Sequence, residues 1–124
     1  MVIVDTNMLS KYILQDEATK TIWQDIGFEN LYVPEIVAME LCRKDKTKAE
    51  LEKTLTFIRS FYLLHINESV SKQAFELVKK YQIKKKIAIP DSIIASFALV
   101  HNAPLLTYNT KDFDYIEGLI LYNY

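Results

Sequence analysis

Apolar and polar residues alternate along the chain in a pattern that predicts short strands, most of them followed by a helix. The strand-like runs are rich in β-branched, aromatic and leucine residues. They cover residues 2–4, 31–33, 62–66, 105–107 and 119–122. Short apolar runs of this kind are typical of a parallel sheet with helices on both faces.

Between these runs, apolar residues recur three or four positions apart, which is the spacing of a helix with one buried face. Helices are expected directly after residues 5–7 and over 18–26, 35–42, 46–61, 69–81 and 93–100. Pro34 is expected in the first turn of its helix. Residues 93–100 are almost entirely apolar, so this helix should be buried on nearly all sides. The pattern predicts an α/β domain with a mostly parallel sheet.

Composition narrows the class of protein. The 124 residues include 15 Lys and Arg against 16 Asp and Glu, and 50% are hydrophobic. This balance favours one domain over residues 1–124 and excludes a disordered chain. No apolar run is long enough to span a bilayer. Asp5 lies where a secretion signal would be basic or apolar, so a cytoplasmic location is expected.

The lone Cys42 excludes an internal disulfide and a zinc site built from paired cysteines. The two histidines, His65 in an expected strand and His101 at an expected helix end, are interpreted as structural residues. Any metal ion is therefore expected to be held by oxygen ligands.

Four acids do not fit a solvated surface easily. Asp5 ends the first strand, Glu40 is flanked by apolar residues on its helix, Asp91 stands at the start of the apolar helix, and Asp112 follows the strand 105–107. Each has a structural alternative, because Asp5 and Asp91 suit helix N-caps and Asp112 suits a turn. Glu40 is one helical turn from basic residues with which it could pair.

Taken together, the acids point to a cation. Ligands of parallel sheets bind beyond the carboxyl ends of the strands, and buried carboxylates that meet without a positive partner repel each other. Mg²⁺ or Mn²⁺ would fit, because both ions prefer oxygen ligands. Such an ion activates water and neutralises phosphoryl oxygens, so phosphodiester hydrolysis is the chemistry that these residues favour.

The same four segments resemble the PIN-domain ribonucleases, and most closely the VapC toxins of toxin–antitoxin pairs. The matching motifs are IVDTN (3–7), VPEIVAMEL (33–41), IPDSIIASFAL (89–99) and LLTYNTKDF (105–113). The resemblance implies a Rossmann-like, three-layer α/β/α sandwich with an acidic pocket that binds Mg²⁺ or Mn²⁺. It also implies an endoribonuclease that cuts transfer RNA or another structured RNA and so blocks translation.

The resemblance assigns roles to individual residues. Asp5, Glu40 and Asp91 match the family's acids and are the expected metal ligands, while Thr6 and Thr107 match supporting hydroxyl residues. The family often has an aspartate where this chain has Asn109, so Asp112 is the alternative for the fourth acid. An amide at this position would weaken a second metal site.

The resemblance also implies a homodimer and a cognate antitoxin whose tail occupies the active-site groove. RNA binding requires positive charge, for which the candidates are Arg43, Lys44, Lys46, Lys48 and the lysines of 84–86. The 84–86 segment is more typical of a solvated turn than of an RNA-binding surface. A self-association surface is expected to draw on the large aromatics Tyr12, Trp23, Phe57, Phe61 and Tyr62.

Other functions remain open from the sequence. The same pocket would suit DNA cleavage or RNA processing, since metal-assisted hydrolysis does not itself select the sugar. A non-catalytic nucleic-acid-binding module is the third alternative.

Overall fold

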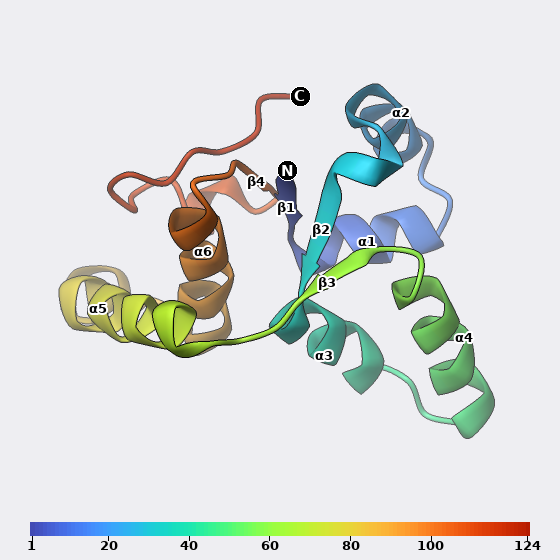
Figure 1. The fold of residues 1–124 in the computed structure, drawn as a ribbon, viewed down its shortest axis with the longest axis horizontal. Coiled ribbons are helices and arrows are strands. Elements are labelled where there is room, and N and C mark those ends of the chain that lie inside the picture. Colours follow the sequence, from blue (N-terminus) through green and yellow to red (C-terminus); the bar gives the residue numbers. More distant parts are fainter.

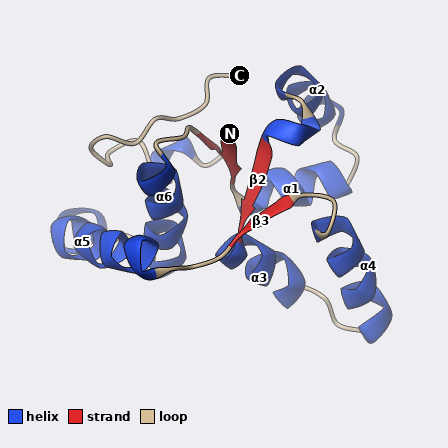
Figure 2. Ribbon diagram, in the orientation of Figure 1, coloured by secondary structure: helices blue, strands red, loops and turns tan.

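The fold is an α/β sandwich built on a sheet of four strands, all parallel. The computed structural model describes residues 1–124. The strands are β1 (Val2–Val4), β2 (Leu31–Pro34), β3 (Tyr62–Leu64) and β4 (Leu105–Leu106), in the spatial order β3-β2-β1-β4. Ile3 pairs with Tyr32 on one side and with Leu105 on the other, so β1 lies inside the sheet. Figure 2 shows the strands enclosed by helices.

Helices cover both faces of the sheet, as the resemblance implied. The helices are α1 (Thr6–Ile13), α2 (Glu17–Ile26), α3 (Glu35–Arg43), α4 (Lys48–Ile58), α5 (Glu68–Lys85) and α6 (Ile89–His101), with the 3-10 turns η1 (Phe28–Asn30) and η2 (Thr110–Asp112). In Figure 1, α5 and α6 lie on one side of the sheet and α1, α2 and α4 lie on the other. The helix α3 follows β2 directly and packs against both α1 and α6. The expected three-layer α/β/α sandwich is therefore confirmed.

The core forms between β1 and the helices on its two faces. Ile3 and Val4 are completely buried, and residues 94–98 of α6 are buried without a break. The expectation that this helix is buried on nearly all sides is correct for its central part. No helix is long and apolar enough to cross a membrane.

Most of the expected aromatic surface is in fact an internal cluster. Trp23 is completely buried and stacks on Tyr12 at a centroid distance of 4.1 Å, and Phe28, Phe57 and Phe61 surround the pair. These rings fill the space between α1, α2 and α4, so apolar packing accounts for them. Tyr62 differs, because it is 59% exposed.

Several expected boundaries are wrong, and three of them change the description of an element. The expected strand over 119–122 is reduced to a single bridge between Leu105 and Leu121. The basic segment 84–86 is not a free turn, because α5 continues to Lys85 and ends at Lys86, which adopts a left-handed conformation (φ 51°). The helix α6 begins at Ile89, because Pro90 is accommodated in its first turn, where a missing N–H costs nothing.

Candidate active site

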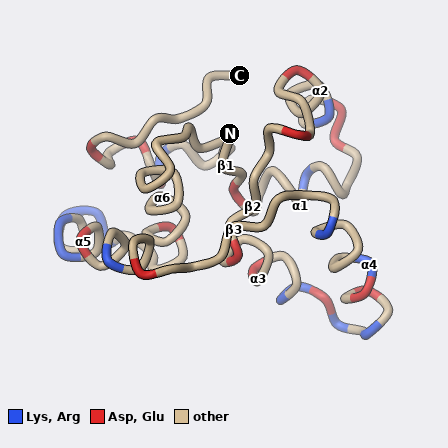
Figure 3. Tube along the Cα trace, in the orientation of Figure 1, with Lys and Arg blue, Asp and Glu red and all other residues tan.

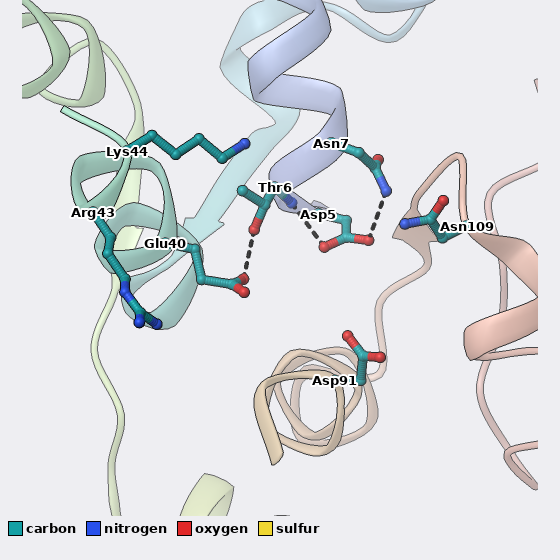
Figure 4. A pocket seen from close by; sticks show the side chains of 8 residues that line it. All are labelled: Asp5, Thr6, Asn7, Glu40, Arg43, Lys44, Asp91 and Asn109. Carbon is teal, nitrogen blue, oxygen red and sulfur yellow. Dashed lines mark hydrogen bonds between the residues drawn. The ribbon is translucent and has the colours of Figure 1, made fainter. Parts of the chain in front are cut away.

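An open pocket of about 480 Å³ lies where the acidic segments meet, and none of its eight lining residues is hydrophobic. Three of these residues are the carboxylates Asp5, Glu40 and Asp91. The other five are Thr6, Asn7, Arg43, Lys44 and Asn109. Figure 4 shows the carboxylates between a basic wall on the α3 side and Asn109 on the opposite side. Three acids from distant parts of the sequence are thus brought to one place.

Asp5 is fixed by hydrogen bonds from the chain around it. It follows β1, is 5% exposed and forms the N-cap of α1, as expected. Its Oδ1 accepts from the backbone N–H of Thr6 at 2.7 Å, and its Oδ2 accepts from the Thr107 hydroxyl at 2.7 Å. Because β1 and β4 are neighbours in the sheet, the residues that follow them lie side by side. The buried carboxylate therefore has polar partners on both oxygens.

Asn7, which was not among the expected site residues, completes this network. Its Nδ2 donates to Asp5 Oδ2 at 3.1 Å and lies 3.3 Å from the Thr107 hydroxyl oxygen. Its Oδ1 accepts from the backbone N–H of Tyr108 at 3.1 Å. Asn7 thus ties the first turn of α1 to the segment after β4. The signal in the sequence was an amide two residues after the strand-end acid, which is also common in ordinary caps.

Glu40 bonds to a hydroxyl and not to a cation. The Thr6 hydroxyl donates to Glu40 Oε1 at 2.7 Å (Figure 4). None of the five ion pairs in the structure includes Glu40, so the alternative of a pair with Arg43 or Lys44 is not formed. The Lys44 ammonium instead donates to the Ser10 hydroxyl of α1 at 3.0 Å.

Asp91 lies in the first turn of α6, where the N-cap position belongs to Ala88. The interpretation of Asp91 as an N-cap is therefore wrong, since α6 begins earlier than the apolar run indicated. The carboxyl group is half-buried, and no hydrogen-bond donor is directed at it.

The pKa values of the two aspartates reflect these surroundings. Burial, followed by repulsion from Asp5, Asp112 and Glu40, raises the pKa of Asp91 from 3.8 to about 7. Burial also raises the pKa of Asp5, but the hydrogen bonds from Thr107, Thr6 and Asn7 oppose this shift. Negative charge in the pocket is therefore only partly compensated by the protein.

Asn109, and not Asp112, lines the pocket at the position of the fourth acid. The backbone N–H of Asn109 donates to the Thr107 hydroxyl oxygen at 3.0 Å, which anchors this residue to the Asp5 network. Asp112 is exposed in η2 and does not line the pocket. It remains near enough to act on the pKa of Asp91.

The histidines lie outside the pocket. His65 follows β3 and is not inside a strand, and its Nδ1 lies 2.8 Å from Glu35 Oε2. His101 ends α6, as expected, and stacks on Phe97. Neither ring contributes to the arrangement of acids.

The donor set suits a hard divalent cation. No three carboxylate, imidazole or thiol groups converge closely enough to form a complete ion cage. The pocket nevertheless offers three carboxylates, two side-chain amides and a hydroxyl as oxygen ligands, and it is open to water. Mg²⁺ is usually held by one or two carboxylates and keeps several waters, so Asp5, Glu40 and Asp91 fit such an ion without a closed cage.

Comparisons with known proteins agree with the geometry of the fold. A family model described as PIN domain matches residues 2–119. The chain is similar to a toxin–antitoxin complex from Klebsiella pneumoniae, with 25% identity, a TM-score of 0.82 and 100% of each chain covered.

Two further solved structures are similar over nearly the whole length. VapBC2 from Rickettsia felis, bound to a DNA fragment from its promoter, has 26% identity and a TM-score of 0.82, with 100% of this chain and 99% of that chain covered. VapBC-1 from nontypeable Haemophilus influenzae has 22% identity and a TM-score of 0.78, with 99% and 98% covered. A search of curated proteins finds no match. The family model and the structural likeness agree on one conclusion: this chain belongs to the PIN domain family.

Proposed function

We propose that this chain is a metal-dependent endoribonuclease that acts as the toxin of a VapBC-type toxin–antitoxin pair. The observation that carries the proposal is the pocket without hydrophobic residues, in which Asp5, Glu40 and Asp91 meet at the carboxyl end of the internal strand β1. Full-length similarity to toxin–antitoxin complexes supports the biological role. The target is an RNA, with transfer RNA or another structured RNA as the class, and its hydrolysis blocks translation.

The metal ligands in this proposal are Asp5, Asp91 and Glu40. Mg²⁺ or Mn²⁺ bound by these oxygens would supply Lewis acidity toward the phosphoryl group and toward the attacking water. Two bonds already occupy Asp5 Oδ2, whereas Oδ1 accepts only one, so Oδ1 retains a lone pair directed at the pocket.

The remaining residues orient these acids. The Thr6 hydroxyl holds Glu40 through Oε1, so Oε2 is available to accept a proton from the attacking water. Thr107 and Asn7 keep Asp5 in one rotamer, and Asn109 supplies a neutral polar group on the wall opposite α3. Asp91 is in its charged form when a cation offsets the burial and repulsion that raise its pKa.

The proposed partners are a cognate antitoxin and a second copy of the chain. Similar proteins are present in structures of toxin–antitoxin complexes, and three of the similar structures contain bound DNA. A basic side chain of the antitoxin placed against the three acids would inhibit the enzyme, because it would compete with the cation for the same oxygens.

The direct test is cleavage of total RNA by the purified protein in Mg²⁺, in Mn²⁺ and in EDTA. We expect fragments in either metal and none in EDTA, and sequencing of the fragment ends identifies the target. Asp5→Asn is the inactive control, and Asp25→Asn on the exposed face of α2 is the matched control that keeps activity. A single-stranded DNA of the same sequence should remain intact. Cleavage that persists in EDTA or in Asp5→Asn would overturn the proposed mechanism.

A further inference from the structure

Two cations line the pocket without neutralising its acids. Arg43 is in the last turn of α3 and Lys44 is the C-cap, and both side chains are exposed. Both residues line the pocket with the three carboxylates. In Figure 4 they form the α3 wall, and their side chains point in different directions from it.

The spacing along α3 would allow ion pairs, but none is formed. Glu40 lies three residues before Arg43 and four before Lys44, an arrangement that favours salt bridges on a helix. Every ion pair in the structure lies elsewhere. Glu40 bonds to the Thr6 hydroxyl instead, so its carboxylate is directed toward the acids and away from the cations.

Both cations line the pocket and keep free donors. The Lys44 ammonium makes one hydrogen bond, to Ser10, and an ammonium has three donors. No hydrogen bond or ion pair engages the Arg43 guanidinium, whose planar group of five donors matches two phosphate oxygens. The bond to Ser10 links α3 to α1 and holds the Lys44 amine beside the pocket.

Cations in the last turn of a helix also stabilise the helix dipole, and this role alone would account for Arg43. It does not account for the bond from Lys44 to α1 or for the position of both groups on one wall of the pocket. The opposite wall carries the neutral Asn109. Positive charge therefore lies on one wall of the pocket only. Cation binding by the three acids would not by itself require this arrangement.

We propose that Arg43 and Lys44 bind the backbone phosphates of an unpaired, single-stranded segment of the RNA, such as a loop of a structured RNA, on one side of the scissile bond. This inference rests on the proposed function and specifies how the same site recognises its substrate. The acids hold the cation at the reacting phosphate, and the α3 wall holds the neighbouring phosphates by charge. Contacts to the backbone position the strand without reading its bases.

The basic residues at the end of α5 provide a matched comparison. Figure 3 shows Lys and Arg gathered on α5 and, separately, at the end of α3 and the start of α4. Lys84 and Lys86 do not line the pocket and make no ion pair. Changing these two lysines alters the net charge of the protein by the same amount as changing Arg43 and Lys44.

The test measures RNA binding as a function of salt. The probe is a fluorescein-labelled, unstructured RNA of about 16 nucleotides, which covers a typical single-strand site. All proteins carry Asp5→Asn, and Mg²⁺ is present, so that binding is measured without cleavage. The variants are Arg43→Gln/Lys44→Gln, the charge-conserving Arg43→Lys, and the control Lys84→Gln/Lys86→Gln, with thermal unfolding as a check on the fold.

Each lost phosphate contact should reduce the slope of log K against log salt by about 0.7 and weaken binding about fivefold at 0.1 M salt. We expect both contacts to be lost in Arg43→Gln/Lys44→Gln, whereas Arg43→Lys and the α5 control should keep the wild-type slope. An unchanged slope in the α3 variant, or an equal loss in the α5 control, would overturn the inference. Cleavage of RNA by the otherwise wild-type protein is measured separately, so failure of the proposed function is distinguished from failure of this inference.

Discussion

Asp5 and Asp91 face the same pocket but are held in opposite ways. Asp5 is almost completely buried and accepts hydrogen bonds from Thr6, Asn7 and Thr107. Asp91 is less buried, yet it has no such donors, and its pKa is raised to about 7. Hydrogen bonds to a carboxylate favour its charged form, and burial without them favours the neutral form. The comparison separates a preorganised acid from one whose charge depends on a cation.

The largest stability effect is expected on the Asp5 side of the comparison. Thr107→Val keeps the shape of the side chain but removes the donor to Asp5 Oδ2 and the acceptor for the Asn109 N–H. Asp5 Oδ2 keeps the bond from Asn7, but it loses its shorter bond, and the Asn109 N–H loses its acceptor. The loss of hydrogen-bond partners by buried polar groups costs about 1–3 kcal/mol in the free energy of unfolding. Urea unfolding measures this loss.

The control for this substitution is Thr56→Val, which removes an exposed hydroxyl bonded to its own helix. Its cost should stay within about 0.5 kcal/mol, as for most surface substitutions. If both valine variants lost the same stability, the network around Asp5 would have no special role in holding that acid.

The stability of the folded chain is expected to depend on pH through Asp91. The folded chain retains the proton of Asp91 up to about pH 7, whereas the unfolded chain releases it near the ordinary pKa of 3.8. The native state therefore binds more protons in this window, and its stability falls as the pH rises from about 4 to about 7. The raised pKa of Asp5 acts in the same sense.

Unfolding at pH 5 and at pH 8 without divalent cations tests this prediction. Asp91→Asn should flatten the pH dependence and should be more stable than the unmodified chain at pH 8. Mg²⁺ should stabilise the unmodified chain more at pH 8 than at pH 5, because a charged carboxylate is the better ligand. An identical pH profile in Asp91→Asn would show that the proton is held elsewhere.

The smallest effect is expected at the position of the fourth acid. Asn109→Asp places a carboxylate on the pocket wall opposite α3, so Mg²⁺ affinity should rise by about tenfold. Asp112→Asn should change affinity by about twofold or less, because Asp112 is exposed and outside the pocket lining. Calorimetric titration with Mg²⁺ measures both. A larger loss in Asp112→Asn would assign the fourth acid to Asp112.

The order of strands and helices could be predicted because it follows from local patterns of apolar and polar residues. Short apolar runs and helical spacing show which residues of a short segment are buried. This information was sufficient to predict the four strands of the sheet and the six helices. The boundaries of α5 and α6 were less accurate. The polar end of α5 is helical without being buried, and Pro90 is compatible with a first turn as well as with a preceding loop.

The sequence by itself also determined which residue types are available to the site. Asp5, Glu40 and Asp91 stand at the ends of elements or on an apolar background, and the tertiary structure brings these three acids into one pocket. The sequence left the fourth position open between Asn109 and Asp112. Only the fold decided which of them lines the pocket, because that depends on the path of the chain after β4.

The partners of the site residues were decided by tertiary structure alone. Thr6 and Glu40 are 34 residues apart, and Thr107 and Asp5 are 102 residues apart. Local spacing allowed a pair between Glu40 and the basic residues that follow it, but the packing of α3 against α1 offered the Thr6 hydroxyl instead. The physical reason is that periodicity specifies which face of an element is buried, whereas the strand order β3-β2-β1-β4 specifies which side chains meet.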